Sequence, residues 1–104
     1  LVQGEETSLS EEPAPMDPAA IDELRQLMAA VTGPGGTAGG LSAGGDIRGK
    51  TGEAEINGGS HSWFTGYRAD DDIAFATLVV LGGGSEAAVA VTDRMLLNLD
   101  APAQ

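Results

Sequence analysis

The chain contains no cysteine and has few basic or aromatic residues. Without cysteine it forms neither disulfides nor thiolate metal sites, and thiol catalysis is excluded. The absence of cysteine is compatible with an oxidising or a reducing compartment. Asp and Glu number 16 against 5 Lys and Arg, a formal net charge of −11. This charge argues against nucleic acid or an anionic membrane surface as a general partner. Any anionic ligand must therefore be held by a local group of donors.

Long apolar segments are also missing. The longest mainly apolar run, residues 73–81, is too short to span a bilayer, and the polar start at Leu1 lacks the features of a signal peptide. A membrane anchor is therefore expected only outside this chain. A chain of 104 residues buries only about 60–65% of the surface that its unfolded form exposes. Since it is so small and no initiating Met is present, we expect a C-terminal piece of a larger domain.

The first third of the chain predicts an arm followed by a helix. Residues 1–15 carry glutamates among Ser, Thr and Pro with little to bury, which is typical of an extended acidic arm. Asp17 and Pro18 predict a helix start, because Asp caps free amides and Pro suits the first turn. A glycine-rich connector, residues 33–45, ends this helix. Its apolar residues recur at helical spacing and predict one packed stripe: Ile21, Leu24, Leu27, Met28 and Val31.

The second part of the chain predicts three strands and a helix. Residues 46–56 and 62–67 are separated by a strong turn signal, Asn-Gly-Gly. Residues 73–81 are apolar on both alternating faces, as expected of a strand covered on both sides. Ser85 predicts the cap of a last helix that extends to about Leu99. The predicted buried stripe of this helix consists of Ala87, Ala88, Val91, Met95 and Leu99.

The predicted fold class is α+β, with three antiparallel strands flanked by helices. A three-stranded sheet that contains a doubly apolar strand needs cover on both faces and pairing at its edge. Two helices hardly provide that cover. We therefore expect the strand of residues 73–81 to pair with a further strand supplied by residues outside this chain.

Residues 44–51, Gly-Gly-Asp-Ile-Arg-Gly-Lys-Thr, fit the phosphate-loop pattern G-x-x-x-x-G-K-[ST]. A phosphate loop follows a buried strand and opens a helix, whereas glycine-rich sequence precedes this stretch and more glycine follows it. No apolar strand ends in the Asp that would hold Mg²⁺. The context therefore predicts that the match arose by chance.

The alternative interpretation is a strand motif in which Lys50 supplies a fixed charge, Thr51 a hydroxyl and Gly52 room for a ligand backbone. Residues 50–55, Lys-Thr-Gly-Glu-Ala-Glu, precede a glycine turn, the aromatic stretch Trp-Phe-Thr-Gly-Tyr, a β-run and a Gly-rich turn. This ordered set resembles the C-terminal part of the transpeptidase domain of penicillin-binding proteins. Upstream, Met28, Val31, residues 36–38 and Leu41 resemble the helix and connector that precede this strand, so the resemblance covers about residues 16–100.

The resemblance implies that residues 16–104 are the C-terminal portion of a serine D,D-transpeptidase domain. It implies a five-stranded antiparallel sheet covered by helices on both faces, with a helical subdomain across the cleft. The activity implied is peptidoglycan cross-linking through a serine acyl-enzyme, with β-lactams as inhibitors, outside the bacterial cytoplasmic membrane. The implied partners are the rest of the domain and the stem peptide. No cofactor and no metal is expected.

The resemblance also assigns roles to three of the residues 50–53, and Gly52 keeps the role of leaving room for a ligand backbone. Lys50 tunes the electrostatics of the cleft and helps proton transfer, and Thr51 binds the carboxylate of the stem peptide. The backbone N–H of Glu53, after Gly52, is one donor of the oxyanion hole.

Two features depart from the family pattern. Glu53 replaces the usual Thr or Ser, and its charge is expected to disfavour an anionic substrate. The Ser-x-x-Lys and Ser-x-Asn motifs are absent, so this chain alone cannot acylate.

Two alternatives remain open: a β-lactamase or β-lactam sensor of the same superfamily, and a non-catalytic acidic interaction module. The other polar candidates favour structural roles. His61, the only histidine, is interpreted as a turn-end residue, not a metal ligand or base. Residues 70–72, three aspartates, lack the spacing of a calcium loop and predict a solvated turn. Glu55 is a guessed partner of Lys50 or Arg48.

Overall fold

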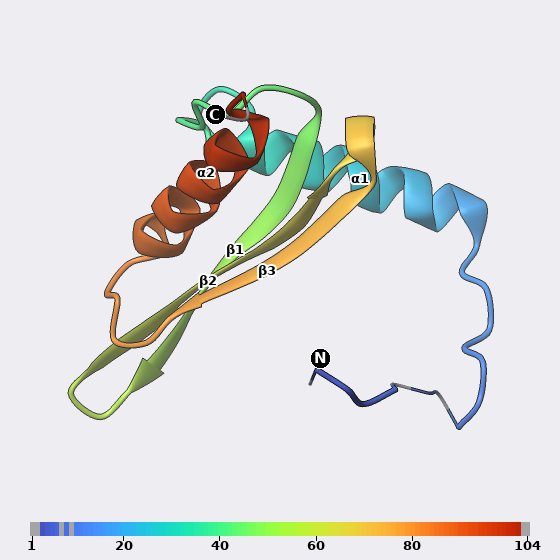
Figure 1. The fold of residues 1–104 in the computed structure, drawn as a ribbon, viewed down its shortest axis with the longest axis horizontal. Helices are drawn as coiled ribbons and strands as arrows, with labels where there is room; N and C mark the ends of the chain where they lie inside the picture. Colours follow the sequence, from blue (N-terminus) through green and yellow to red (C-terminus); the bar gives the residue numbers. More distant parts are fainter. Residues whose placement is uncertain (1–2, 7, 9, 103–104) are drawn as a thin grey trace.

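A computed structural model describes residues 3–6, 8 and 10–102. Its elements are, in chain order, α1 (Pro18–Thr32), β1 (Ile47–Ile56), β2 (Gly59–Arg68), the 3-10 turn η1 (Ala69–Asp71), β3 (Ile73–Val79) and α2 (Glu86–Asp100). The strands form an antiparallel sheet in the order β1-β2-β3. The predicted α+β fold of a helix, three antiparallel strands and a helix is confirmed (Figure 1).

Helix α1 begins where the Asp-Pro pair predicted. Asp17 Oδ1 accepts a hydrogen bond from Ala19 N at 3.2 Å, which satisfies one free amide of the first turn. The predicted apolar stripe is only partly covered by the described residues. Met28 is half-buried, whereas Leu24 and Leu27 are 46% and 68% exposed. The prediction that the whole stripe packs is therefore not met within this part of the chain.

The two hairpins follow from local turn chemistry. β1 and β2 pair in continuous register from Ile47 opposite Arg68 to Ile56 opposite Gly59. The turn between them uses Gly58 at φ 95°, a conformation that favours glycine. β3 ends at Val79 instead of reaching residue 81, because the chain turns there.

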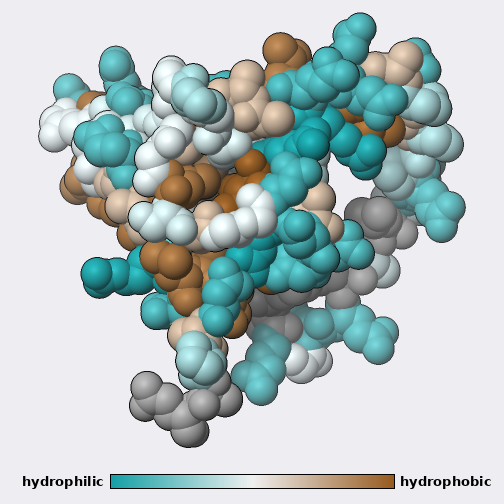
Figure 2. All heavy atoms as spheres, turned by 90° about the horizontal axis from the view of Figure 1, so that it is seen from above, coloured by the Kyte–Doolittle hydropathy of each residue, from teal (hydrophilic) through white to brown (hydrophobic). Residues whose placement is uncertain are grey.

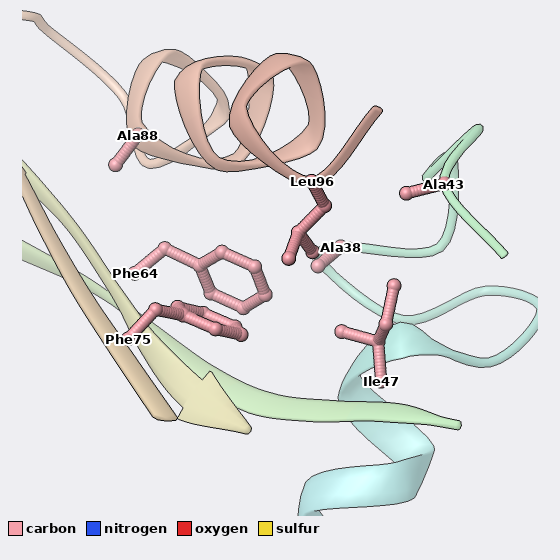
Figure 3. Packing of buried hydrophobic residues seen from close by; sticks show 7 residues of the cluster. All are labelled: Ala38, Ala43, Ile47, Phe64, Phe75, Ala88 and Leu96. Atoms are coloured by element: carbon pink, nitrogen blue, oxygen red, sulfur yellow. The ribbon is translucent and has the colours of Figure 1, made fainter. Parts of the chain in front are cut away.

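The core lies between the sheet and α2, which covers one of its faces (Figure 1). Figure 3 shows the rings of Phe64 and Phe75 beneath α2, with Leu96 and Ala88 directed at them from the helix. The two ring centroids are 5.2 Å apart and the planes are tilted by 52°, a favourable aromatic arrangement. Ile47 joins this cluster from β1, and two alanines join it from the connector: Ala38 and Ala43.

Two glycines face each other on β1 and β2, next to the core. Gly49 of β1 lies opposite Gly66 of β2. A Cβ added to Gly49 would lie 2.6 Å from Phe64 Cε1, and one added to Gly66 would lie 2.1 Å from Arg48 O. Both distances are far below contact, so the Phe64 ring requires glycine at position 49 and the neighbouring backbone of β1 requires it at position 66.

The buried face of α2 differs from the prediction. Ala88, Thr92 and Leu96 are fully buried, whereas the predicted Val91 and Leu99 are 51% and 58% exposed. Met95, also predicted as buried, is 37% exposed. Brown, apolar residues reach the surface on the left half of Figure 2, the half that holds α2 in Figure 1. The stripe of Ala88, Thr92 and Leu96 faces the sheet because its small and hydroxyl side chains allow the helix to approach the sheet closely.

Hydroxyl groups anchor that approach. Ser62 Oγ accepts a hydrogen bond from Ala88 N at 2.9 Å, and Thr92 Oγ1 donates to Ala88 O at 2.8 Å. Thr92 Oγ1 also lies 2.7 Å from Thr77 Oγ1 of β3. Ser85, predicted as the helix cap, makes no side-chain capping bond. The amide of Ala88 in the first turn is instead satisfied by Ser62 from β2.

Arg68 fastens the other end of α2. Its side chain is only 6% exposed, and it donates to Asp100 at 2.9 Å and to Asp71 Oδ2 at 2.6 Å. Hydrogen bonds from this guanidinium lower the pKa of the Asp71 carboxyl below its usual range. The C-terminal turn of α2, η1 and the end of β2 are thereby joined through one buried cation.

The sheet face opposite α2 is partly open. α1 lies against β1 on this side, beside Lys50 and Thr65. Farther along, Trp63 is 41% exposed and its register partner Leu78 is 45% exposed. The described residues therefore cover β3 on the α2 side but leave Leu78 open on the other, and the predicted cover on both sides stays a prediction for the complete domain. The apolar Trp63–Leu78 pair has no cover in the described part of the chain.

Among the residues that the structure describes, no helix combines the length and apolar character needed to cross a bilayer.

Candidate functional site

The four residues with predicted roles lie side by side on β1: Lys50, Thr51, Gly52 and Glu53. β1 is the first strand in the sheet order, so one of its edges is not paired with another strand of the described residues. The stretch that fits the phosphate-loop pattern runs into this strand and opens no helix. This local structure differs from that of a phosphate loop, in agreement with the context read from the sequence.

The backbone groups of β1 alternate between β2 and the free edge of the sheet. Asp46 O, directly before β1, accepts a hydrogen bond from Ala69 N at 3.0 Å, so Asp46 faces β2. In an antiparallel ladder every second residue turns both of its backbone groups to the partner strand. Ile47 and the odd-numbered residues after it therefore face away from β2. Consistently, Ile47 O accepts a hydrogen bond from Thr32 Oγ1 at 2.6 Å.

This alternation turns the amides of Thr51 and Glu53 toward the free edge. The side chain of Lys50 reaches the same edge, where Nζ donates a hydrogen bond to Thr51 O at 2.7 Å. The ammonium group of Lys50 and the backbone amides of Thr51 and Glu53 therefore lie along the same free edge of β1. These are donor groups, and together they suit an anionic or carbonyl oxygen that approaches the edge.

The hydroxyl of Thr51 lies on the α2 side of the strand and is held by the connector. Thr51 is 7% exposed, and its Oγ1 is 2.7 Å from Oγ1 of Thr37. The connector itself is fastened to α2, since Asp93 Oδ1 accepts hydrogen bonds from Ser42 N at 3.0 Å and Ala43 N at 2.8 Å. The position of Thr51 thus depends on a segment far from it in sequence.

Gly52 differs from Gly49 in what surrounds it. A Cβ added to Gly52 would lie 3.7 Å from Trp63 Cβ, an ordinary contact. The packing of this chain therefore does not require glycine at position 52, whereas it requires glycine at 49. A requirement at position 52 must come from something that approaches the strand from outside.

The carboxylate of Glu53 is directed at the first turn of α2. Glu53 Oε1 accepts a hydrogen bond from Ser85 N at 3.1 Å. A negative charge at a helix N-terminus is favourable by about 0.3–1 kcal/mol. The unusual Glu at this position thus has a structural partner, the backbone amide of the N-cap residue Ser85.

An apolar groove of about 470 Å³ lies behind Lys50. Four residues of α1 form one wall: Leu24, Leu27, Met28 and Val31. Gly49 and Thr65 of the sheet form the other wall. The aliphatic stem of Lys50 therefore lies in low-polarity surroundings while its ammonium reaches the strand edge.

The remaining candidates have structural roles. His61 Nδ1 accepts a hydrogen bond from Leu81 N at 3.0 Å and so supports the turn after β3. Residues 70–72 are exposed, as predicted for a solvated turn, but Asp71 pairs with Arg68 and Asp70 accepts a hydrogen bond from Asp46 N. The guessed partner of Glu55 is wrong, because Arg48 pairs with Asp46 and, within the described ranges, Glu55 forms no ion pair. Across those same ranges, no group of His, Asp and Glu side chains is arranged to hold a metal ion.

An ion pair between Arg48 and Asp46 lies at the start of β1, just before the candidate site. Arg48 donates to both carboxylate oxygens of Asp46, at 2.9 and 3.0 Å, and to Arg25 O at 3.3 Å. Hydrogen bonding to Arg48 lowers the pKa of the Asp46 carboxyl. The bonds fasten the start of β1 to α1.

Sequence reasoning assigned no role to three residues that fix the site: Thr37, Ser62 and Asp93. Thr37 and Asp93 act across 14 and 50 residues of sequence, respectively, and no local pattern marks such pairs. Ser62 replaces a helix cap from a strand 26 residues away. Only the fold identifies these partners.

Residues 4–97 match the family of penicillin-binding protein transpeptidase domains. The chain belongs to this family, so it is part of a transpeptidase of cell-wall synthesis. No curated protein and no solved structure gives a significant match. The family match confirms the resemblance drawn from the sequence, and it begins within the stretch predicted as an acidic arm.

Proposed function

We propose that this chain supplies one wall of the active site of a peptidoglycan D,D-transpeptidase that acts through a serine acyl-enzyme and binds β-lactams. In this proposal Lys50 provides the positive charge of the cleft, and Thr51 binds the substrate carboxylate. The backbone amide of Glu53 donates to the oxyanion, and Gly52 leaves room for the substrate backbone. Residues 16–104 form the C-terminal portion of the domain, preceded by the arm of residues 1–15.

The observation that supports this proposal is the free edge of β1. The ammonium of Lys50 lies 2.7 Å from Thr51 O, and the alternation of the strand turns the amide of Glu53 to the same edge. Acyl transfer needs donors fixed in advance where negative charge develops on the carbonyl oxygen. A strand edge provides such donors without a conformational change.

The nucleophile must come from outside this chain. The sequence contains neither Ser-x-x-Lys nor Ser-x-Asn. The proposed partner is the remaining N-terminal part of the domain, which carries both motifs and completes a five-stranded sheet covered on both faces. The open Trp63–Leu78 pair and the exposed residues of α1 and α2 are apolar surfaces suited to such cover. The proposed location is the outer face of the bacterial cytoplasmic membrane.

Two other functions make different predictions. A β-lactamase or β-lactam sensor would use the same strand but treat the acyl-enzyme differently, by hydrolysing it or by signalling. A non-catalytic acidic module would keep the fold and take up no β-lactam at all. The ordered donors on β1 favour the catalytic proposal over the module.

The test is acylation of the complete protein by a fluorescent penicillin. Lys50→Ala is expected to reduce the second-order rate of labelling by at least about 100-fold, because removal of one electrostatic donor at a reacting centre costs about that much. Arg94→Ala, which removes an exposed cation on α2 remote from β1, serves as the matched control and is expected to leave labelling unchanged.

Two results would contradict the proposal. Absence of labelling in the complete wild-type protein, with no Ser-x-x-Lys encoded upstream, would exclude the enzyme. An unchanged labelling rate in Lys50→Ala would remove this lysine from the site.

A further inference from the structure

Thr37 lies on the connector and takes no part in the proposed chemistry of residues 50–53. It is exposed, yet its hydroxyl oxygen is 2.7 Å from that of buried Thr51. The contact spans 14 residues of sequence and joins the connector to the strand that carries the proposed donors. Its length is that of a well-formed hydroxyl–hydroxyl hydrogen bond.

The hydrogens of this pair can be counted. Each hydroxyl has one hydrogen and can accept from others. One of the two hydrogens lies between the oxygens, so the pair has one hydrogen left to donate elsewhere. If Thr51 donates to Thr37, Thr51 presents only lone pairs and repels a carboxylate. If Thr37 donates to Thr51, the hydrogen of Thr51 is free and its hydroxyl is polarised as a stronger donor.

The connector also determines where Thr37 stands relative to the strand edge. Thr32 contacts Ile47 O at the start of β1, and Thr37 contacts Thr51 four residues farther along. Asp93 holds the other end of the connector through Ser42 N and Ala43 N. Thr37 is therefore held between two fixed points, with its hydroxyl beside that of Thr51.

We infer that Thr37 is a positioning residue for carboxylate recognition, which donates its hydroxyl hydrogen to Thr51 Oγ1 and so directs the hydrogen of Thr51 to the ligand. This inference rests on the proposed function of Thr51. It assigns the recognition of carboxylate to the threonine pair, not to Thr51 alone.

The experiment uses the complete protein and two probes, a penicillin and its methyl ester, in which the carboxylate is blocked. Thr37→Val is expected to slow acylation by the penicillin about tenfold, which corresponds to about 1.4 kcal/mol, the size of one lost hydrogen bond. Acylation by the ester is expected to change by less than about twofold. The selectivity for the free acid over the ester should therefore fall.

Further variants separate positioning from folding. Thr37→Ser keeps the hydroxyl and should restore the selectivity, whereas Thr37→Ala should behave like Thr37→Val. Ser42→Ala removes a hydroxyl of the same connector that has no bond to β1 and should leave the selectivity unchanged. In a Thr51→Val background, Thr37→Val should have no further effect, because its partner is gone.

The outcomes are distinct from those that test the proposed function. If the wild-type protein is not acylated, the proposed function fails. If the wild-type protein is acylated but Thr37→Val and Thr37→Ala keep the wild-type selectivity, or react faster with the free acid, the inference about Thr37 is wrong and the proposed function stands. An equal slowing of acid and ester would also overturn it, since that indicates a general structural defect.

Discussion

At the scale of single residues, the two glycines of the Gly-Lys-Thr-Gly stretch have different reasons to be glycine. Gly49 faces the core, where an added Cβ would lie 2.6 Å from Phe64 Cε1 and 2.7 Å from Thr65 O. Gly52 has room for a Cβ within this chain. The sequence presents them as equivalent, whereas the structure shows a packing requirement at Gly49 and none at Gly52.

Alanine at these two positions should separate stability from activity. Gly49→Ala is expected to lower the free energy of unfolding by about 1–3 kcal/mol through overpacking. Gly52→Ala should leave the unfolding midpoint unchanged but slow acylation by about 5- to 150-fold, the rate change that corresponds to the same free-energy range when the clash is with a ligand backbone. Thermal unfolding and penicillin labelling of both variants check this. Full activity of Gly52→Ala would exclude close approach of a ligand at this glycine.

Arg68 gives a prediction of pH dependence. It lowers the pKa of Asp71, so the stabilisation is complete above the ordinary aspartate pKa of about 3.9 and is lost as the pH falls through and below that value. Arg68→Gln should lower the melting temperature by several degrees near neutral pH, and the difference from wild type should shrink below about pH 4. Melting temperatures measured across this range test the sign. A difference that stays constant with pH would refute the assignment.

At the scale of elements, α2 is attached to the sheet by hydroxyl groups. Ser62→Ala should destabilise the protein by about 1–3 kcal/mol, because it leaves the buried amide of Ala88 without a partner. Ser60→Ala is the matched control on the same strand. Ser60 uses its backbone carbonyl, not its side chain, to bind Gly83 N, so the substitution should change stability by less than about 0.5 kcal/mol. Equal unfolding midpoints for both variants would contradict the anchoring role.

The elements themselves were largely predictable, and their orientation was not. The Asp-Pro start of α1 and the Asn-Gly turn of the first hairpin depend on local backbone chemistry, which neighbouring residues determine. The face of α2 depends on the sheet it meets. Both of its stripes have helical spacing, and hydrophobicity favours Val91 and Leu99 over Ala88 and Thr92, but close packing on the sheet reverses that choice.

The candidate site was predictable in part for the same reason. The motif of β1 and its family resemblance point to the strand and its donor groups, so Lys50 and Glu53 could be proposed from the sequence. The edge to which their groups turn follows from pairing with β2, and the partner of Thr51 follows from the path of the connector. Both are contacts between distant segments, and single-sequence patterns do not encode them.

At the scale of the whole molecule, the sheet is covered on the α2 side and partly open on the other. Trp63, the only tryptophan of the chain, lies on the open face and is 41% exposed. If the rest of the domain covers this face, Trp63 must become buried in the complete protein.

Fluorescence quenching by acrylamide measures that burial directly. The signal that Trp63→Phe removes from the complete protein is the contribution of Trp63. We expect this contribution to be poorly quenched and blue-shifted, as for an indole enclosed by apolar side chains. Quenching as strong as that of a free indole would show that the face stays open, and the proposed cover would be wrong.

The connector has one more consequence, for the length and polarity of any peptide that pairs with β1. Thr32 contacts Ile47 O and Thr37 contacts the Thr51 hydroxyl, so we expect a pairing peptide to use the stretch from Thr51 to Ile56, about 17 Å at 3.3 Å per residue. An extended peptide would fill this stretch with about five residues. We therefore expect β1 to take a short peptide end, with its last group near the two threonine hydroxyls, in preference to the interior of a long chain.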